Sequence, residues 1–251
     1  MTLDLLHGHR ANRLTILDCG TFSVRGGERI IGIPAYLIET DQGARILVDG
    51  GFPPAYLTDE PAAAKADGLA AFGSLVAYSR HQTLPDQLAL AGTSLPDITL
   101  HILTHGHIDH VGALPLIRCP LVVTRTERAD PRPRYFGNAR PIDWPDVPTH
   151  LVDELTVLCH GITLIPTPGH TPGHMSLQVD LPASGTLILA ADAINRASEP
   201  AEHFADAADP ASARTSANGL FALQQKTGGT LIYGHDPTQW ADLPKAPQHF
   251  R

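Results

Sequence analysis

The feature that most constrains this chain is the segment Thr104-His105-Gly106-His107-Ile108-Asp109-His110, which directly follows the apolar run of residues 98–103. In a helix, residues two apart lie about 200° apart around the axis, so His105 and His107 could not share an ion there. In extended backbone both side chains point to the same side, so we expect the pair at a strand end. Asp109 and His110 then fall at the turn that follows. Three imidazoles and a carboxylate within six residues are donors suited to zinc and its first-row neighbours.

Further ligand-type side chains follow apolar runs downstream. His170 comes after the run 162–165, Asp192 after 187–191, and His235 after 231–233 through one glycine. Strand ends are where a rigid scaffold presents side chains to a site, and flanking glycines let the backbone approach closely. Surface histidines on polar loops are the alternative, but packing gives no reason for so many ligand-type residues after buried strands. His174, four residues past His170, is expected to support the site by hydrogen bonding rather than to ligate.

The remaining pattern predicts a layered α/β architecture with two sheets. A β-hairpin is expected over 34–40 and 45–49, and helices over 85–92, 111–117 and 210–225. Further strands are predicted at 98–103, 121–123, 151–158, 162–165, 176–180, 186–190 and 230–233. Residues 51–80 are expected to form loop with some short helix. The proline-rich residues 129–150 are expected to form a long irregular loop, of the kind that serves as a lid or binding loop.

Composition bounds the partners and the location. The chain has 251 residues, with 18 Lys and Arg against 26 Asp and Glu, which gives a formal net charge of −8. Nucleic acid or an anionic membrane would demand a basic face, so we expect neither as a partner and expect a small-molecule substrate. The three cysteines are widely spaced and offer no disulfide framework or zinc knuckle. With no signal-like or membrane-length apolar run, we expect one domain over residues 1–251, located in the cytoplasm.

Taken together, the ligand-type residues resemble the five motifs of the metallo-β-lactamase superfamily. The resemblance rests on residues 105–110, His170, Asp192, Gly234-His235-Asp236 and the turn Val48-Asp49-Gly50-Gly51. Within that superfamily the chain looks most like the N-acyl-homoserine lactonases, which are quorum-quenching enzymes. That likeness lies in Arg125-Thr126-Glu127, residues 167–177, Asp192-Ala193 and residues 234–236.

The resemblance implies a fold and a reaction. The fold would be a four-layer αβ/βα sandwich with a dinuclear metal site at one edge of the sheets. One metal would be held by His105, His107 and His170, and the other by Asp109, His110 and His235, with Asp192 bridging. Two divalent ions are thus the implied cofactor, with zinc placed first among zinc, iron, manganese and cobalt. A bridging hydroxide would attack the ester carbonyl of a lactone, foremost an N-acyl-homoserine lactone, and Asp109 would pass a proton to the leaving alkoxide. A homodimer is an expectation from the family alone.

One position departs from the lactonase pattern. Those lactonases carry a tyrosine three residues after the bridging aspartate, where this chain has Asn195. Asparagine can donate a hydrogen bond but is shorter and cannot act as an acid. Either another group, such as Tyr36 or Tyr135, takes over, or the substrate is a different lactone or ester. The sequence leaves both open.

Other functions are weighed against lactone hydrolysis. Glyoxalase II-like thioester hydrolysis would call for basic residues to hold an anionic substrate, and the stretch after His235 supplies few. A β-lactamase is disfavoured without an export signal, and RNA processing is disfavoured by the acidic balance. A metal-stabilised binding module would not need an open bridging site. Trp144 and Phe136 in the proline-rich segment are candidates for an apolar substrate wall, or for packing and subunit contacts.

Overall fold

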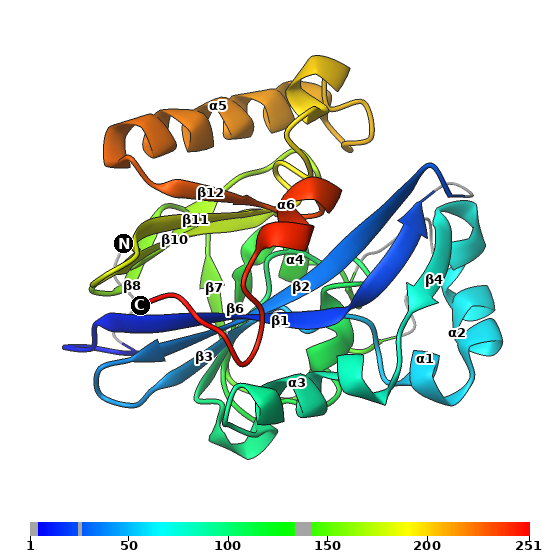
Figure 1. Cartoon of the computed structure of the whole chain (residues 1–251), viewed down its shortest axis with the longest axis horizontal. Coiled ribbons are helices and arrows are strands. Elements are labelled where there is room, and N and C mark those ends of the chain that lie inside the picture. The colour runs from blue at the N-terminus through cyan, green and yellow to red at the C-terminus, as the bar shows by residue number, and fades with distance from the viewer. Residues whose placement is uncertain (1–4, 25–26, 134–141) are drawn as a thin grey trace.

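The computed structural model describes residues 5–24, 27–133 and 142–251. Two sheets face each other, and helices cover both outer faces (Figure 1). The larger sheet has the strand order β4-β1-β2-β3-β5-β6-β7. Its strands are β1 (Ala11–Val24), β2 (Arg29–Thr40), β3 (Arg45–Val48), β4 (Gly73–Ala77), β5 (Leu100–Ile102), β6 (Leu121–Thr124) and β7 (Thr149–Val152). From β3 to β7 neighbouring strands run parallel, so their carboxyl ends lie at one edge.

The smaller sheet has the order β12-β11-β10-β9-β8. Its strands are β8 (Thr156–Cys159), β9 (Ile162–Pro166), β10 (Met175–Leu181), β11 (Gly185–Ala191) and β12 (Thr230–Tyr233). The α-helices are α1 (Ala55–Thr58), α2 (Glu60–Asp67), α3 (Leu84–Leu90), α4 (Arg125–Arg128), α5 (Pro210–Thr227) and α6 (Pro237–Asp242). Five 3₁₀ segments complete the described elements: η2 (Leu69–Ala71), η3 (Arg80–Gln82), η4 (Leu95–Asp97), η5 (Val111–Ala113) and η6 (Glu199–Glu202).

Alternating apolar residues build three cores and so fix the layers. Ile46 and Val48 of β3 face the core between the sheets, whereas Leu47 faces the outer core on the side of α3. On β11, Leu187 and Leu189 point inward, while Ile188 packs in the core beneath α5. A strand with both faces buried needs this continuous apolar character, because successive side chains point to opposite sides. The expected αβ/βα four-layer arrangement is confirmed.

Most predicted elements are found close to their expected positions. The hairpin of β2 and β3, the strands β5, β6 and β9 to β12, and the helices α3 and α5 are confirmed. The predicted strand 151–158 is two strands, β7 and β8, that belong to different sheets. The predicted helix over 111–117 is wrong, because this segment contains only the 3₁₀ turn η5. The long strand β1 and the short strand β4 were not predicted, and residues 129–133 and 142–148 are irregular as expected.

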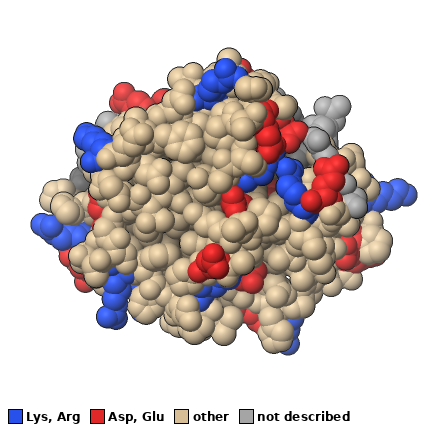
Figure 2. All heavy atoms as spheres, turned by 45° about the horizontal axis from the view of Figure 1, so that its top comes forward, with Lys and Arg blue, Asp and Glu red and all other residues tan. Residues whose placement is uncertain are grey.

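Charge is distributed without a continuous basic surface on the face drawn in Figure 2. Lys and Arg side chains are scattered there, and several lie beside Asp or Glu. Among the described residues, the chain contains no helix that is long and apolar enough to cross a membrane. All three cysteines are buried and none forms a disulfide.

Candidate metal centre

The candidate ligands come from loops that leave both sheets at one edge. His105, His107, Asp109 and His110 follow β5, His170 follows β9, Asp192 follows β11 and His235 follows β12. The two sheets are joined at this edge, where the Thr104 carbonyl accepts a hydrogen bond from the Met175 amide at 3.0 Å. Side chains that are far apart in sequence therefore lie close together, because the strands that precede them end at the same edge.

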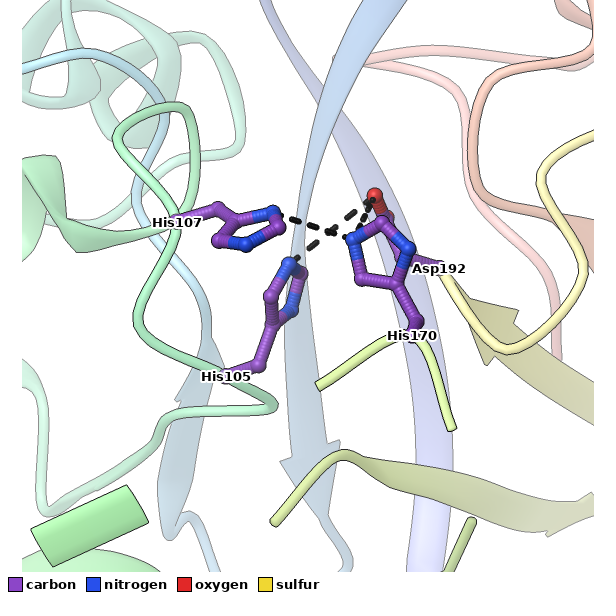
Figure 3. Close-up of side chains that lie close together, drawn as sticks. All are labelled: His105, His107, His170 and Asp192. Atoms are coloured by element: carbon purple, nitrogen blue, oxygen red, sulfur yellow. Dashed lines mark hydrogen bonds and ion pairs between the residues drawn. The ribbon is translucent and has the colours of Figure 1, made fainter. Parts of the chain in front are cut away.

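One group consists of His105, His107, His170 and Asp192, whose ligand-type atoms lie within 4.8 Å of one another (Figure 3). His170 Nε2 lies 3.1 Å from Asp192 Oδ2, and His105 Nε2 lies 3.9 Å from the same oxygen. His107 Nδ1 approaches His170 Nε2 to 3.0 Å. His105 and His107 thus direct ring nitrogens toward the same group from the irregular segment just after β5.

A second group consists of Asp109, His110 and His235, again within 4.8 Å. His235 Nε2 lies 3.4 Å and His110 Nε2 3.7 Å from Asp109 Oδ2. Both imidazoles also face Asp192 Oδ1, at 3.2 and 3.3 Å. The two oxygens of Asp192 therefore face different groups. This is the arrangement that a carboxylate needs to bridge two ions.

The donor atoms at the centre fit a pair of cations. His105 Nε2, His110 Nε2, His235 Nε2 and Asp192 Oδ1 are all buried, and none forms a well-directed hydrogen bond with a described residue. Buried polar atoms without partners cost free energy, so several that converge indicate a site suited to a cation. Neutral imidazoles and carboxylates are the N and O donors that zinc and its neighbours prefer.

The other nitrogen of three of these rings is held by the protein. Nδ1 of His110 lies 2.8 Å from Asp49 Oδ2, and Nδ1 of His235 lies 2.9 Å from the Gly32 carbonyl. Nδ1 of His105 lies 3.1 Å from Thr104 Oγ1. A hydrogen bond at one ring nitrogen sets the tautomer and turns the other nitrogen to the metal. Nε2 is therefore directed inward in all three rings.

The surroundings shift the pKa values of His105 and His107 in one direction and that of His110 in the other. Burial, and then the neighbouring His110, lower the pKa of His105 well below its usual value, and burial and His170 do the same for His107. Burial would also lower the pKa of His110, but Asp109, Asp192 and Asp49 raise it well above the usual value. The neutral rings of His105 and His107 keep lone pairs available to a cation.

His174 supports the centre without joining either group. Its Nε2 accepts a hydrogen bond from the Asp192 amide at 3.0 Å, and its Nδ1 lies 2.8 Å from Thr167 Oγ1. Burial, with a further contribution from His170, lowers the pKa of His174 to about 3. A neutral ring that accepts from the Asp192 backbone agrees with the hydrogen-bonding role predicted for this histidine.

A cavity of about 400 Å³ opens beside the centre. Five candidate ligands line it: His107, Asp109, His170, Asp192 and His235. Its large apolar lining residues are Phe22, Val24, Ile31, Phe52, Leu69 and Phe72. Arg29, Asn195, Arg196 and Asp206 also line it, together with Ala207 and Ala208. A cavity that combines candidate metal ligands with a mainly apolar lining is suited to a small, largely apolar molecule.

Asn195 is held tightly at the cavity. Its backbone amide and its Nδ2 both donate to Glu199, the second at 3.2 Å, and its carbonyl accepts from the His235 amide at 2.8 Å. Tyr36, proposed as a replacement for the lactonase tyrosine, lies in the core between the sheets and is not among the described residues that line the cavity. Tyr135, the other replacement considered, lies outside the described residues.

Trp144 and Phe136, the aromatic residues of the proline-rich segment, were candidates for a substrate wall. Trp144 Nε1 donates to the Asp130 carbonyl at 2.9 Å, and the Arg128 guanidinium lies over its ring. Trp144 therefore packs against the outer core on the side of α3. It lines a separate cavity with Leu114 and Val147 and is not among the described residues that line the cavity beside the centre. Phe136 lies outside the described residues, so its predicted alternatives stay open.

Sequence reasoning assigned no role to two carboxylates beneath the ligands. Asp49 accepts from the Thr104 amide at 2.9 Å, from Thr104 Oγ1 at 2.8 Å and from His110. Glu127 accepts from the amides of Gly106 and Gly173. Both residues occur in segments that carry the family resemblance, namely 48–51 and 125–127, and that likeness was the signal that could have identified them.

Comparisons with known proteins agree with this geometry. The family model of the metallo-β-lactamase superfamily matches residues 29–235. The chain is 28% identical to an N-acyl homoserine lactonase of Bacillus thuringiensis, with 99% of this chain and 100% of the relative covered. It is 27% identical to the N-acyl homoserine lactonase AttM of Rhizobium radiobacter, over 95% of this chain and 98% of the relative.

A solved structure of an N-acyl homoserine lactone hydrolase, with the product N-hexanoyl-L-homoserine bound at its catalytic metal centre, has a similar fold. Its TM-score to this chain is 0.81 at 23% identity, and the match covers 96% of this chain and 100% of that one. A Bacillus thuringiensis AiiA variant with N-decanoyl-L-homoserine at its active site matches with the same score and identity, over 96% of this chain and 100% of that one.

Proposed function

This chain belongs to the metallo-β-lactamase superfamily, and we propose on that basis that it is a dinuclear metal-dependent hydrolase that opens the ring of a lactone. The foremost substrate is an N-acyl-homoserine lactone. The observation that carries the proposal is Asp192, whose two oxygens face two separate groups of buried histidines beside a cavity. The relatives over nearly the whole chain are named as N-acyl homoserine lactonases, which supports the substrate.

The proposed ligands fall into the two groups described above. His105, His107 and His170 would hold one divalent ion, and Asp109, His110 and His235 the other, with Asp192 shared. Zinc is the first choice because histidine nitrogens and carboxylate oxygens are its common donors. When bound, such a pair supplies Lewis acidity, which acidifies water and polarises an ester carbonyl.

The chain's own residues would orient the substrate and move a proton. The apolar wall formed by Phe22, Val24, Ile31, Phe52, Leu69 and Phe72 offers an acyl chain a surface away from water. Asp109 lines the same cavity and is 8% exposed, so its carboxylate can reach both the centre and a bound molecule. We assign Asp109 the transfer of a proton, taken from the attacking water, to the alkoxide that leaves when the ring opens.

Charge around the cavity favours a neutral substrate over an anionic thioester. Arg196 lines the cavity, but Nε and an amino group of its guanidinium are bound to the two carboxylate oxygens of Glu202. Hydrogen bonds from Arg196 and Ser198 lower the pKa of Glu202 to about 2, and Arg29 adds to this effect. Asp206 also lines the cavity, and its charge acts on Arg196 as well. The charge of Arg196 is therefore paired, whereas an anionic substrate would need it free.

We further propose that residues 1–251 act as one hydrolase domain, because the candidate ligands come from both sheets. A cytoplasmic location and the absence of nucleic acid and membrane partners remain part of the proposal. The three buried, unpaired cysteines suit a reducing compartment. A homodimer stays an expectation from the family.

The test is a base-uptake assay of the metal-loaded protein on three substrate classes. These are lactones of varied acyl length, a glutathione thioester and a β-lactam. We expect proton release with lactones only, accompanied by the ring-opened hydroxy acid in the mass spectrum. Cleavage of the thioester with no lactone opened would overturn the proposal.

The same assay on Asn195→Tyr tests the departure from the lactonase pattern. If Asn195 limits the substrate range, the variant should gain activity on N-acyl-homoserine lactones relative to simple lactones. An unchanged ratio would show that this position does not decide the substrate class.

A further inference from the structure

Glu127 is a buried carboxylate that touches neither of the candidate ligand groups directly. It lies on the single helical turn α4, which follows β6, and is 5% exposed. Its Oε2 accepts a hydrogen bond from the Gly106 amide at 3.1 Å. Its Oε1 accepts from the Gly173 amide at 3.2 Å and from Thr171 Oγ1. Three donors from two loops therefore converge on one carboxylate.

These two loops carry the three histidines of one group. The loop of Gly106 also carries Asp109 and His110 of the other group, but there His110 Nδ1 lies against Asp49 Oδ2 rather than Glu127. Gly106 lies between His105 and His107, and Thr171 is the residue after His170. All three of these histidines belong to the group that shares Asp192 Oδ2. The hydrogen bonds of Glu127 thus join the two chain segments that hold this group, and none of them reaches the segment of His235.

The loop that carries His170 also fits closely on α4. Thr124 caps the helix, since its Oγ1 accepts from the Glu127 amide at 3.3 Å, and it donates to the Gly173 carbonyl at 2.6 Å. A Cβ at position 173 would lie 2.5 Å from Thr124 Oγ1 and 2.6 Å from the Glu127 amide nitrogen. Glycine is therefore required there for the loop to reach the carboxylate.

A carboxylate at this place has a cost that apolar packing would avoid. Burial raises the pKa of Glu127, and the hydrogen bonds from Thr171, Gly173 and Gly106 oppose that rise. Removing the carboxylate alone would leave the buried amides of Gly106 and Gly173 without this acceptor, which costs free energy. Because these donors belong to the loops of three candidate ligands, the hydrogen bonds that offset the cost of burial also fix the placement of those ligands.

We infer that Glu127 is a positioning residue that sets the geometry of the His105, His107 and His170 group, and not that of the Asp109, His110 and His235 group. This inference rests on the proposed function, because it takes both groups to be metal sites. It predicts that a change at Glu127, which is not a candidate ligand of either ion, alters the affinity for one ion and not for the other.

Glu127→Gln is the sharpest test. The side-chain amide of glutamine has one acceptor oxygen, which can keep the hydrogen bonds from Thr171 and Gly173. The NH₂ group of the glutamine then faces the Gly106 amide, and two donors cannot form a hydrogen bond with each other. Titration of the metal-free protein with Zn²⁺ should give two ions for the unaltered chain. For the variant, we expect one affinity to fall about 10- to 100-fold and the other to stay unchanged.

Two further substitutions identify which ion is affected. His170→Ala and His235→Ala should each remove one ion from the unaltered chain. In the Glu127→Gln background, His235→Ala should remove the tightly held ion, whereas His170→Ala should leave it in place. The opposite pattern, or equal weakening of both ions, would overturn the inference.

Controls separate positioning from misfolding. Glu60→Gln makes the same chemical change at an exposed site in the first turn of α2 and should leave both affinities unchanged. Thr171→Val keeps Glu127 and both backbone donors, so it should weaken the same ion less, and it carries the test if Glu127→Gln does not fold. If the unaltered chain fails to bind two ions, the proposed function fails. If it binds two and both Glu127→Gln and Thr171→Val bind them equally well, the inference alone fails.

Discussion

His101 and His105 lie four residues apart and illustrate two opposite uses of a buried imidazole. His105 has one nitrogen beside Thr104 Oγ1 and directs the other toward Asp192. His101, on β5, is fully buried, and neither of its ring nitrogens has a hydrogen-bond partner among the described residues. Burial lowers the pKa of His101 to about 4, although the nearby Asp49 opposes the shift. The same residue type is thus a candidate metal ligand at position 105. At position 101 it makes the stability of the fold depend on pH.

We predict that His101→Leu makes stability less sensitive to acid. Because the folded-state pKa of His101 lies below the unfolded value of 6.5, the unfolded chain binds the proton first as the pH falls. His101 therefore leaves the free energy of unfolding unaffected above about pH 6.5. Between about pH 6.5 and pH 4 it lowers that free energy by about 1.4 kcal/mol for each pH unit of acidification. Urea unfolding at pH 7.5 and pH 5 should show a smaller difference for the variant. An equal difference would contradict the prediction.

Asp109 offers a second prediction at the scale of one residue. Asp109→Asn keeps the size of the side chain but removes the charge and the proton-carrying oxygen. We expect kcat for lactone opening to fall by about 10²- to 10⁴-fold with the fold retained. Steady-state kinetics, together with circular dichroism and metal content, measure this. Turnover within threefold of the unaltered chain would remove the role assigned to Asp109.

The candidate ligands could be predicted from sequence because their signal is local. His105, His107, Asp109 and His110 lie within six residues, and such a density of ligand-type residues after a buried strand is visible in the sequence itself. The residues that hold them are distant in sequence. Asp49 is 61 residues from His110, and Glu127 is 46 residues from Gly173. The family likeness of the segments 48–51 and 125–127 could have singled out these two residues, but nothing in the sequence shows which loops they join.

At the scale of elements, the predictions succeeded where apolar alternation was strong and failed where the backbone serves another purpose. Residues 111–117 contain helix-forming residues, yet the segment has only η5. The Gly112 amide donates to the Gly51 carbonyl at 2.8 Å, so its backbone joins the loop after β3 rather than a helical ladder. The strand β1 was not predicted, and its pairing with β2 is interrupted by register shifts, one of them between Asp18 and Thr21.

Two glycines give a matched prediction about elements. A Cβ at Gly112 would lie 2.3 to 2.6 Å from the carbonyl oxygens of Phe52, Gly51 and Gly50, whereas nothing lies within 4 Å of one at Gly219 in α5. We expect Gly112→Ala to destabilise the protein by about 2 kcal/mol or more, because the contacts are with backbone. Gly219→Ala should stabilise it by up to about 1 kcal/mol through helix propensity. Thermal unfolding of both variants measures this, and a fall in Tm for Gly219→Ala or none for Gly112→Ala would be contrary to it.

On the scale of the whole molecule, the centre depends on the sandwich as a unit. Four candidate ligands follow a strand of the larger sheet: His105, His107, Asp109 and His110. The other three follow strands of the smaller sheet: His170, Asp192 and His235. Each ligand group takes side chains from both sheets. The central core between the sheets therefore sets the distance between the halves of the site, as well as contributing to stability. The sandwich could be predicted from its motifs, but the distance across it arises only on folding.

The most direct test of the central claim is the rate of N-acyl-homoserine lactone opening as divalent ions are returned to the metal-free protein. We predict that each chain binds two Zn²⁺ ions and that the rate of ring opening rises in proportion to the fraction of chains in which both sites are occupied. Turnover by the metal-free protein, or a chain that holds two ions and opens no lactone, would contradict the account.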